Sequence, residues 1–150
     1  MPSSYTCLRF HLIWSTKHRE PLLSDEVRTR MFSYIGGILR NDGGVLLAAG
    51  GMPDHVHLLA DIGKVHSVAD GVRDIKSNSS GWIHQTYPEL VSFAWQTGYG
   101  AFTVSYSSTD VVKAYIANQA RHHRRRSFQE EFVEFLQRHE IEYDERYLWE

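Results

Sequence analysis

Cysteine is almost absent from this 150-residue chain, which contains Cys7 and no other. A single thiol excludes an internal disulfide and is typical of proteins that stay in a reducing cytoplasm. The sequence also has no apolar run near the roughly 20 residues that a membrane-spanning helix needs, and its start lacks the features of a signal peptide. We find no internal repeat or low-complexity segment. We therefore expect a soluble, cytoplasmic protein in which residues 1–150 form one domain.

A strong excess of charge of either sign is missing as well, because the formal net charge is −2. The charge is nevertheless unevenly distributed. Residues 1–126 hold 14 Lys and Arg against 10 Asp and Glu, a balance of +4, whereas residues 127–150 hold 2 against 8, a balance of −6. A basic body with an acidic end is typical of proteins with a polyanionic partner. A solvated acidic helix at the end of an ordinary domain would give the same distribution.

The chain does contain a regular succession of apolar segments. Branched and aromatic runs predict strands at residues 5–16, 45–51, 55–61 and 101–106. Apolar residues at helical spacing predict helices at 25–41, at 67–87, from 107 to about 123, and from 127 onward. The order β-α-β-β-α-β with two additional C-terminal helices predicts an α+β fold. Its ferredoxin-like, or RRM-like, antiparallel sheet would carry two helices on one face and leave the other free for a site or for the extra helices.

The segment "MPDHVHLLAD", residues 52–61, places two histidines on one predicted strand. Residues two apart on a strand point to the same face, so His55 and His57 project together while Val56 and Leu58 face the other way. Neutral imidazole is a common metal ligand, and this pair can present two nitrogens to one ion. The alternative is two partly exposed histidines that have no partner.

Two known classes of protein with a His-x-His metal site do not fit this chain. Nucleotide hydrolases of the histidine-triad type need a third histidine where this chain has Leu59. The barrel of the amidohydrolases needs about 250 residues. A third metal ligand must therefore come from another part of the chain.

The segment "DVVKAYIANQARHHRRR", residues 110–126, is the best source of that ligand. Tyr115 and Gln119 are four residues apart, so they share one face of the predicted helix. The carbonyl oxygen of Gln119 suits a hard cation such as Mg²⁺ or Mn²⁺, and Tyr115 would lie one turn away from it. The alternatives are a Tyr115 that packs on the sheet and a Gln119 that faces solvent.

The chain resembles the single-tyrosine HUH transposases of small bacterial insertion sequences, the IS200-like transposases, in the segments "MPDHVHLL", "WQTGYGAFTVSYS", "VVKAYIANQARHHRRRSFQEEF" and "YDERYLWE". HUH stands for His, a hydrophobic residue and His. The resemblance implies that His55 and His57 are metal ligands, that Gln119 is the third ligand and that Tyr115 is the nucleophile. It also implies a ferredoxin-like fold and a homodimer, in which the histidines of one subunit work with the tyrosine helix of the other.

The family cuts and rejoins single-stranded DNA at the hairpin-containing ends of a mobile element. The resemblance therefore implies a metal-dependent DNA strand transferase and endonuclease that uses Mg²⁺ or Mn²⁺. Tyr115 would attack a phosphorus atom, the 3′ hydroxyl would leave, and a 5′-phosphotyrosine intermediate would form. A second 3′ hydroxyl can reverse this step, so no ATP is needed, consistent with the lack of a P-loop motif.

Basic residues directly follow the proposed catalytic helix and are the first candidates for DNA phosphate contacts: Arg121, Arg124, Arg125 and Arg126, together with His122 and His123. Arg73 and Lys76 on the second predicted helix are further candidates for DNA binding. The alternative for the arginine run is a cationic helix C-terminus, which is favourable by about 0.3–1 kcal/mol per charge.

Three other functions stay open from the sequence. A non-catalytic module that binds single-stranded nucleic acid would keep the basic run and have no use for Tyr115. A small metal-dependent hydrolase would turn over soluble phosphoesters without Tyr115. A domesticated relative that acts on chromosomal repeat hairpins would use the same residues as the transposase.

Overall fold

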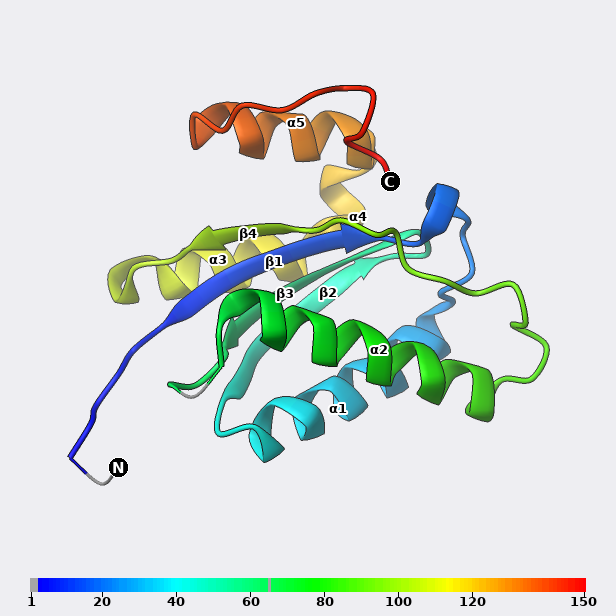
Figure 1. Cartoon of the computed structure of the whole chain (residues 1–150). Coiled ribbons are helices and arrows are strands. Elements are labelled where there is room, and N and C mark those ends of the chain that lie inside the picture. Colours follow the sequence, from blue (N-terminus) through cyan, green and yellow to red (C-terminus); the bar gives the residue numbers. More distant parts are fainter. Residues whose placement is uncertain (1–2, 65) are drawn as a thin grey trace.

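The computed structural model describes residues 3–64 and 66–150, which contain the predicted antiparallel sheet (Figure 1). The strands in these residues are β1 (Arg9–Ser15), β2 (Val45–Met52), β3 (His55–Asp61) and β4 (Gly100–Thr103). They lie in the order β2-β3-β1-β4, and each neighbouring pair is antiparallel. The order of elements along the chain is β-α-β-β-α-β, so the predicted ferredoxin-like fold class is confirmed.

Two long helices, α1 (Asp25–Asn41) and α2 (Val68–Thr86), cover one face of the sheet (Figure 1). Each begins after a serine, Ser24 or Ser67, whose hydroxyl accepts the backbone N–H three residues further on. Such caps satisfy an N–H group that has no partner within the helix. Among the described residues, no helix has both the length and the apolar character needed to cross a membrane.

The main core lies between these two helices and the sheet. Alternate residues of the central strands, such as Leu12, Trp14 and Leu58, meet the apolar stripes of the helices, which include Ile35 and Ile75. All five side chains have no exposed surface. Burial of one such aliphatic side chain contributes roughly 1.5–3 kcal/mol, so this layer supplies much of the stability on which the site depends.

The C-terminal part of the chain covers the opposite face of the sheet with α3 (Thr109–Ala117), α4 (Gln119–His122) and α5 (Phe128–Arg138) (Figure 1). Short 3₁₀ turns lie at Lys17–Arg19 and Tyr106–Ser108. A second apolar cluster attaches α5 to the sheet, and its buried members are Ile13, Phe102, Phe128, Phe132 and Leu136. Both faces of the sheet are therefore covered.

Glycine at position 50 lets α3 lie close to the sheet. A Cβ atom on Gly50 of β2 would lie 2.5 Å from the backbone oxygen of Ile116 on α3, which is too close for any side chain. Because Ile116 follows Tyr115 in α3, this close approach also sets the height of Tyr115 above the sheet.

The predicted continuous helix from 107 to about 123 is wrong, because the chain departs from helical geometry at Asn118. The Asn118 side-chain amide donates to the Ala114 oxygen at 2.9 Å, and its backbone N–H donates to the Tyr115 oxygen, three rather than four residues back. Asparagine side chains compete in this way with the backbone bonds of a helix. Three helices rather than the predicted two therefore follow β4 in the described residues.

Strands β1 and β4 differ from their predicted bounds. β1 begins at Arg9 rather than at residue 5, and Tyr5 is 90% exposed. β4 ends at Thr103, and a 3₁₀ turn occupies Tyr106–Ser108, where the prediction extended the strand to residue 106. Aromatic and branched residues predicted both strands correctly but extended each beyond its paired part.

Candidate active site and metal centre

Strand β3 carries His55 and His57 on the face of the sheet that α3, α4 and α5 cover. Their neighbours Val56 and Leu58 belong to the core beneath α1 and α2, as the alternation of side chains along a strand predicts. Both imidazoles have 0% exposed surface. The C-terminal helices therefore enclose the histidine pair on the face that was predicted to carry either a site or these extra helices.

A hydrogen bond to Asp54 orients the ring of His55. Its Nδ1–H donates to the carboxylate of Asp54 at 2.7 Å, and its Nε2 lies 3.1 Å from Oε1 of Gln119. Although burial alone would raise it, this hydrogen bond lowers the pKa of Asp54. Because Asp54 accepts the proton on Nδ1, the Nε2 atom of a neutral His55 has a free electron pair directed into the site.

His57 lies between two other buried groups, His11 of β1 and Glu131 of α5. The Nε2–H of His57 donates to Glu131 Oε1 at 3.0 Å, and its Nδ1 lies 2.8 Å from Nε2 of His11. Burial lowers the pKa of His57 to about 4 and that of His11 to about 3, so both rings are neutral at neutral pH. A neutral His57 that donates from Nε2 must accept at Nδ1, and the bond between the imidazoles therefore runs from His11 to His57.

The site's polar side chains meet at the carboxylate of Glu131, which is 0% exposed. Its Oε1 lies 3.0 Å from His57 Nε2 and 3.3 Å from His123 Nε2, and its Oε2 accepts from the hydroxyl of Tyr115. Although burial alone would raise it, hydrogen bonds from His123 and His57 hold the pKa of Glu131 far below its usual value. Against the effect of burial, the same carboxylate raises the pKa of His123. The Gln119 amide also donates to Oε2, at 3.5 Å, so Glu131 is an ionised carboxylate with four donors.

Tyr115 of α3 lies over the histidines of its own chain. The centre of its ring is 5.9 Å from that of His57 and 4.4 Å from that of His122, on which it stacks. Arg126 donates to the hydroxyl oxygen at 3.2 Å. Burial and the hydrogen bond to Glu131 raise the pKa of Tyr115 above its usual value, so this phenol carries its proton at neutral pH.

The residues around Glu131 form a candidate ligand set for a metal ion. His55, His57, His123 and Glu131 each offer one ligand atom, and these atoms all lie within 4.8 Å of one another. Gln119 adds an amide oxygen, which lies 3.0 Å from His123 Nε2. Imidazole nitrogens combined with carboxylate and amide oxygens suit a divalent ion such as Mn²⁺. The cluster could therefore bind a metal ion.

Residues 4–119 match the protein family described as Transposase IS200 like. The chain belongs to the IS200-like transposases. This confirms the resemblance drawn from the sequence. The matched residues end at Gln119, so His123 and Glu131 of the candidate ligand set lie beyond them.

Individual relatives of this transposase agree with the family. The ISDra2 transposase TnpA of Deinococcus radiodurans is 30% identical over 117 residues, which cover 75% of this chain and 84% of the relative. A solved structure described as a transposase of Deinococcus radiodurans R1 is 32% identical, with a TM-score of 0.62, and the comparison covers 77% of this chain and 94% of that one. The structure of a REP-associated tyrosine transposase bound to a REP hairpin has a TM-score of 0.55 at 16% identity, covering 77% and 71%, and is similar in fold.

Of the predicted DNA-binding arginines of the transposase, Arg126 contacts Tyr115. A cavity of about 610 Å³ at α4 and the turn that follows it is lined by Arg121, His122, Arg124, Arg125 and Arg126. Arg126 also forms an ion pair with Glu134 of α5, whereas Arg121, Arg124 and Arg125 are exposed. The position of the run suits contact with a DNA strand at the tyrosine, and this contact stays a prediction.

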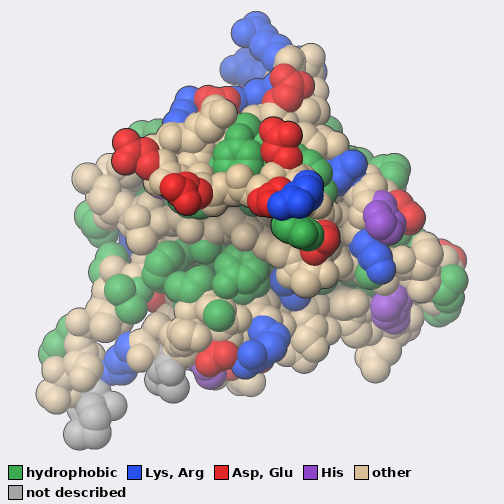
Figure 2. Space-filling model, turned by 45° about the horizontal axis from the view of Figure 1, so that its top comes forward, with side chains coloured by type: hydrophobic (Ala, Val, Ile, Leu, Met, Phe, Trp, Pro, Cys, Tyr) green, Lys and Arg blue, Asp and Glu red, His purple; other side chains and the backbone are tan. Residues whose placement is uncertain are grey.

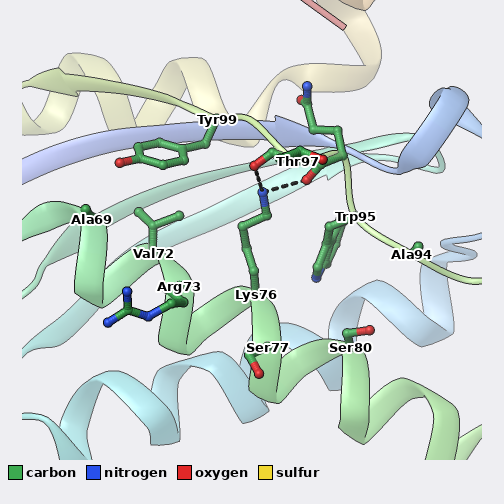
Figure 3. A pocket seen from close by; sticks show the side chains of 11 residues that line it. Ala69, Val72, Arg73, Lys76, Ser77, Ser80, Ala94, Trp95, Thr97 and Tyr99 are labelled. Atoms are coloured by element: carbon green, nitrogen blue, oxygen red, sulfur yellow. Dashed lines mark hydrogen bonds between the residues drawn. The ribbon is translucent and has the colours of Figure 1, made fainter. Parts of the chain in front are cut away.

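Arg73 and Lys76 lie on α2, which covers the other face of the sheet from Tyr115. Figure 3 shows Lys76 rising toward the loop before β4, where its ammonium donates to backbone oxygens of residues 96–98 at 2.6 to 3.1 Å. Burial lowers the pKa of Lys76 to about 8. Arg73 is exposed and pairs with Asp70 at 2.6 Å. DNA binding by this pair also stays a prediction, and it would need a surface separate from the arginine run.

Charge on the α5 side of the transposase is mixed. Figure 2 turns the top of Figure 1 toward the viewer and shows Asp and Glu side chains beside Lys and Arg rather than one continuous basic surface. The ion pair between Arg126 and Glu134 is one example of this arrangement. The acidic end of the sequence therefore contacts part of the basic run directly.

Four residues of the site were not predicted as site residues from the sequence, namely His11, Asp54, His123 and Glu131. Glu131 did carry a signal, because it interrupts the apolar stripe that Phe128 and Phe132 form on α5. His11 is likewise a polar residue within an otherwise apolar strand. Asp54 directly precedes the predicted strand and His123 lies in the basic run, and neither pattern points to the histidine pair.

Proposed function

We propose that this transposase cleaves and rejoins single-stranded DNA at hairpin-containing ends through a covalent link to Tyr115, with a divalent cation bound by His55, His57 and Gln119. In this proposal residues 1–150 form one HUH transposase domain. The observation that carries it is that the Tyr115 hydroxyl and the His57 imidazole bind the same buried carboxylate, that of Glu131. The REP-associated relative of similar fold, which was solved with a REP hairpin, supports hairpin DNA as the substrate.

The chemistry of the ligand atoms favours Mn²⁺ over Mg²⁺. Mg²⁺ prefers oxygen ligands, whereas nitrogen ligands bind Mn²⁺ more readily. The predicted set of His55, His57 and Gln119 contains two nitrogens, and His123 would add a third. A divalent ion held there would polarise a phosphate oxygen and favour the ionised form of a nearby phenol.

The side chains around Tyr115 account for the covalent step. The phenol oxygen attacks the phosphorus and gives up its proton, which Glu131 is placed to accept. A bond forms between the Tyr115 oxygen and phosphorus, the bond from phosphorus to the 3′ oxygen breaks, and the proton passes from Glu131 through solvent to the 3′ oxygen. Attack by another 3′ hydroxyl reverses these changes and joins the strands. Arg126 donates to the phenol oxygen and would stabilise its negative charge.

A covalent-adduct assay tests the proposal. A single-stranded hairpin oligonucleotide is incubated with the transposase and Mn²⁺, and protein–DNA adducts are separated on a denaturing gel. We expect adducts with the wild-type protein and none with Tyr115→Phe. The control is Tyr34→Phe, which removes a hydroxyl from α1 on the opposite side of the sheet and should leave the adduct unchanged.

Other outcomes of the same assay identify the competing functions. Adducts that persist in Tyr115→Phe would exclude this residue as the nucleophile. Binding of the oligonucleotide without any adduct would favour a non-catalytic single-stranded DNA-binding module. Turnover of a soluble phosphoester by Tyr115→Phe would favour a small metal-dependent hydrolase.

A further inference from the structure

His11 contacts the histidine pair from the neighbouring strand. It lies on β1, is 3% exposed, and its Nε2 is 2.8 Å from Nδ1 of His57. The rings of His11 and Phe135 on α5 pack edge to face, with 5.2 Å between the ring centres. The His11 ring is therefore held in place. Its Nε2 contacts Nδ1 of His57, which is the nitrogen that does not contact Glu131.

The two histidines of the HUH pair differ in what supports them. The Nδ1–H of His55 donates to the carboxylate of Asp54, and a carboxylate is a usual partner behind a metal-bound histidine. His57 has an imidazole, that of His11, in the equivalent position. Unlike an ionised carboxylate, an imidazole nitrogen can either donate or accept a hydrogen bond, depending on the tautomer.

We propose that His11 is a positioning residue for His57, and that the hydrogen bond between them reverses direction when a divalent cation binds. Without the cation, His57 donates from Nε2 to Glu131 and accepts at Nδ1 from His11. With a cation on Nε2, the proton of His57 lies on Nδ1 and is donated to His11 Nε2. The inference rests on the proposed metal site.

The protons balance in this exchange. The proton on His57 Nε2 leaves to solvent, and the proton on His11 Nε2 moves to His57 Nδ1. His11 takes up one proton from solvent on its own Nδ1, so the two rings together hold the same number of protons before and after. Both imidazoles are neutral before the cation binds and after it has bound.

An uncharged hydrogen-bond partner for His57, such as the His11 imidazole, also suits the charge already present in this site. Glu131 is an ionised carboxylate with no exposed surface, and Asp54 lies behind His55. A further carboxylate in the place of His11 would add negative charge to a buried site before any cation binds, and burying an unpaired charge is costly. His11 can hold the ring of His57 without that cost.

Metal binding by three proteins tests the role of His11. Mn²⁺ is titrated into the wild type, His11→Phe and His11→Gln, and the free ion is measured by electron paramagnetic resonance. We expect His11→Phe to bind Mn²⁺ 10- to 100-fold more weakly, because it keeps a ring but has no hydrogen-bonding atom. The amide of His11→Gln can both donate and accept, so its affinity should stay near that of the wild type. Equal affinity of His11→Phe and the wild type would overturn the inference.

The tautomers of the unaltered protein give a second test, which depends on no variant folding. Long-range ¹H–¹⁵N spectra locate the imidazole protons, with Zn²⁺ as a diamagnetic probe ion. We expect the His57 proton on Nε2 without Zn²⁺ and on Nδ1 with it, and a proton that stays on Nε2 in the presence of bound Zn²⁺ would contradict the reversal. If the wild type binds neither ion, the proposed metal site itself is wrong, which separates the two failures.

Discussion

Buried histidines make the stability of this transposase sensitive to acid. Burial lowers the pKa of His57 to about 4, whereas the same group in an unfolded chain titrates near 6.5. Between these values the unfolded chain binds a proton that the folded chain does not. The contribution of neutral, buried His57 to the free energy of unfolding is therefore complete above about pH 6.5. It is lost as the pH falls toward 4.

We expect the free energy of unfolding to fall by on the order of 3 kcal/mol from His57 alone between pH 7 and pH 4. Glu131 acts in the same direction, because its lowered pKa stabilises the fold above about pH 4.5 and this contribution is lost as the pH falls further. The measurement is urea denaturation in the presence of EDTA. His57→Asn should weaken the pH dependence, and His18→Asn, at an exposed position, should not. The same pH dependence in His57→Asn as in the wild type would contradict the prediction.

For single residues, the sequence predicted which side chains share a face of one strand or helix. It did not predict which side chains from distant parts of the chain contact each other. The His55 and His57 pair follows from the two-residue repeat of a strand. Gln119 was expected to reach the pair, and the structure places its amide oxygen beside His55 Nε2 even though the helix is divided between Tyr115 and Gln119. Glu131 comes from α5, 74 residues after His57 along the chain, and no local pattern states which buried group it meets.

Among the elements, α5 decides how open the site is. It contributes Glu131 and covers His55 and His57, which have no exposed surface. The helix is capped by Ser127, whose hydroxyl accepts the Glu130 N–H in a capping box. Phe132 packs beside Phe128 and Trp149, with ring centres 5.7 and 5.9 Å apart. The histidines are therefore enclosed for as long as these aromatic contacts hold.

Replacing Phe132 by alanine should loosen α5 and expose the histidines. Truncation of a buried phenylalanine costs about 3–5 kcal/mol, measured here by urea denaturation. We also expect faster modification of His55 and His57 by diethylpyrocarbonate, followed by peptide mass spectrometry. Gln137→Ala, at an exposed position of α5, is the matched control and should change neither quantity. Unchanged labelling of both histidines in Phe132→Ala would mean that α5 does not protect them.

The elements themselves could be predicted largely from the sequence. Helix α1 and strand β3 have the predicted bounds, because a serine cap and a clear apolar repeat define them locally. The break at Asn118 was missed, since its side-chain bond to Ala114 competes with a helix that the apolar pattern favours. The covering of the histidine face by α5 depends on tertiary packing, which the order of elements leaves open.

For the whole molecule, the central fact is that one chain brings Tyr115 to its own histidines. The ring of Tyr115 lies 5.9 Å from that of His57, and both groups bind Glu131 of the same chain. The family resemblance implied a homodimer in which the histidines and the tyrosine come from different subunits. The geometry of the single chain has no need of a second tyrosine helix, so we expect each site to act within one chain whether or not two chains associate.

Mixing two inactive variants distinguishes these arrangements. Tyr115→Phe keeps the histidines, and His57→Asn keeps the tyrosine, so a dimer that shares its sites would regain one complete site when the two are combined. We expect the mixture to form no covalent adduct with the hairpin oligonucleotide, because every chain lacks part of its own site. Mixtures of each variant with the wild type control for inhibition by the added protein and should retain the wild-type adduct. Adduct in the mixture of the two variants would establish sharing between subunits, and the contact of Tyr115 with its own Glu131 would then describe a resting arrangement that gives way when two chains meet.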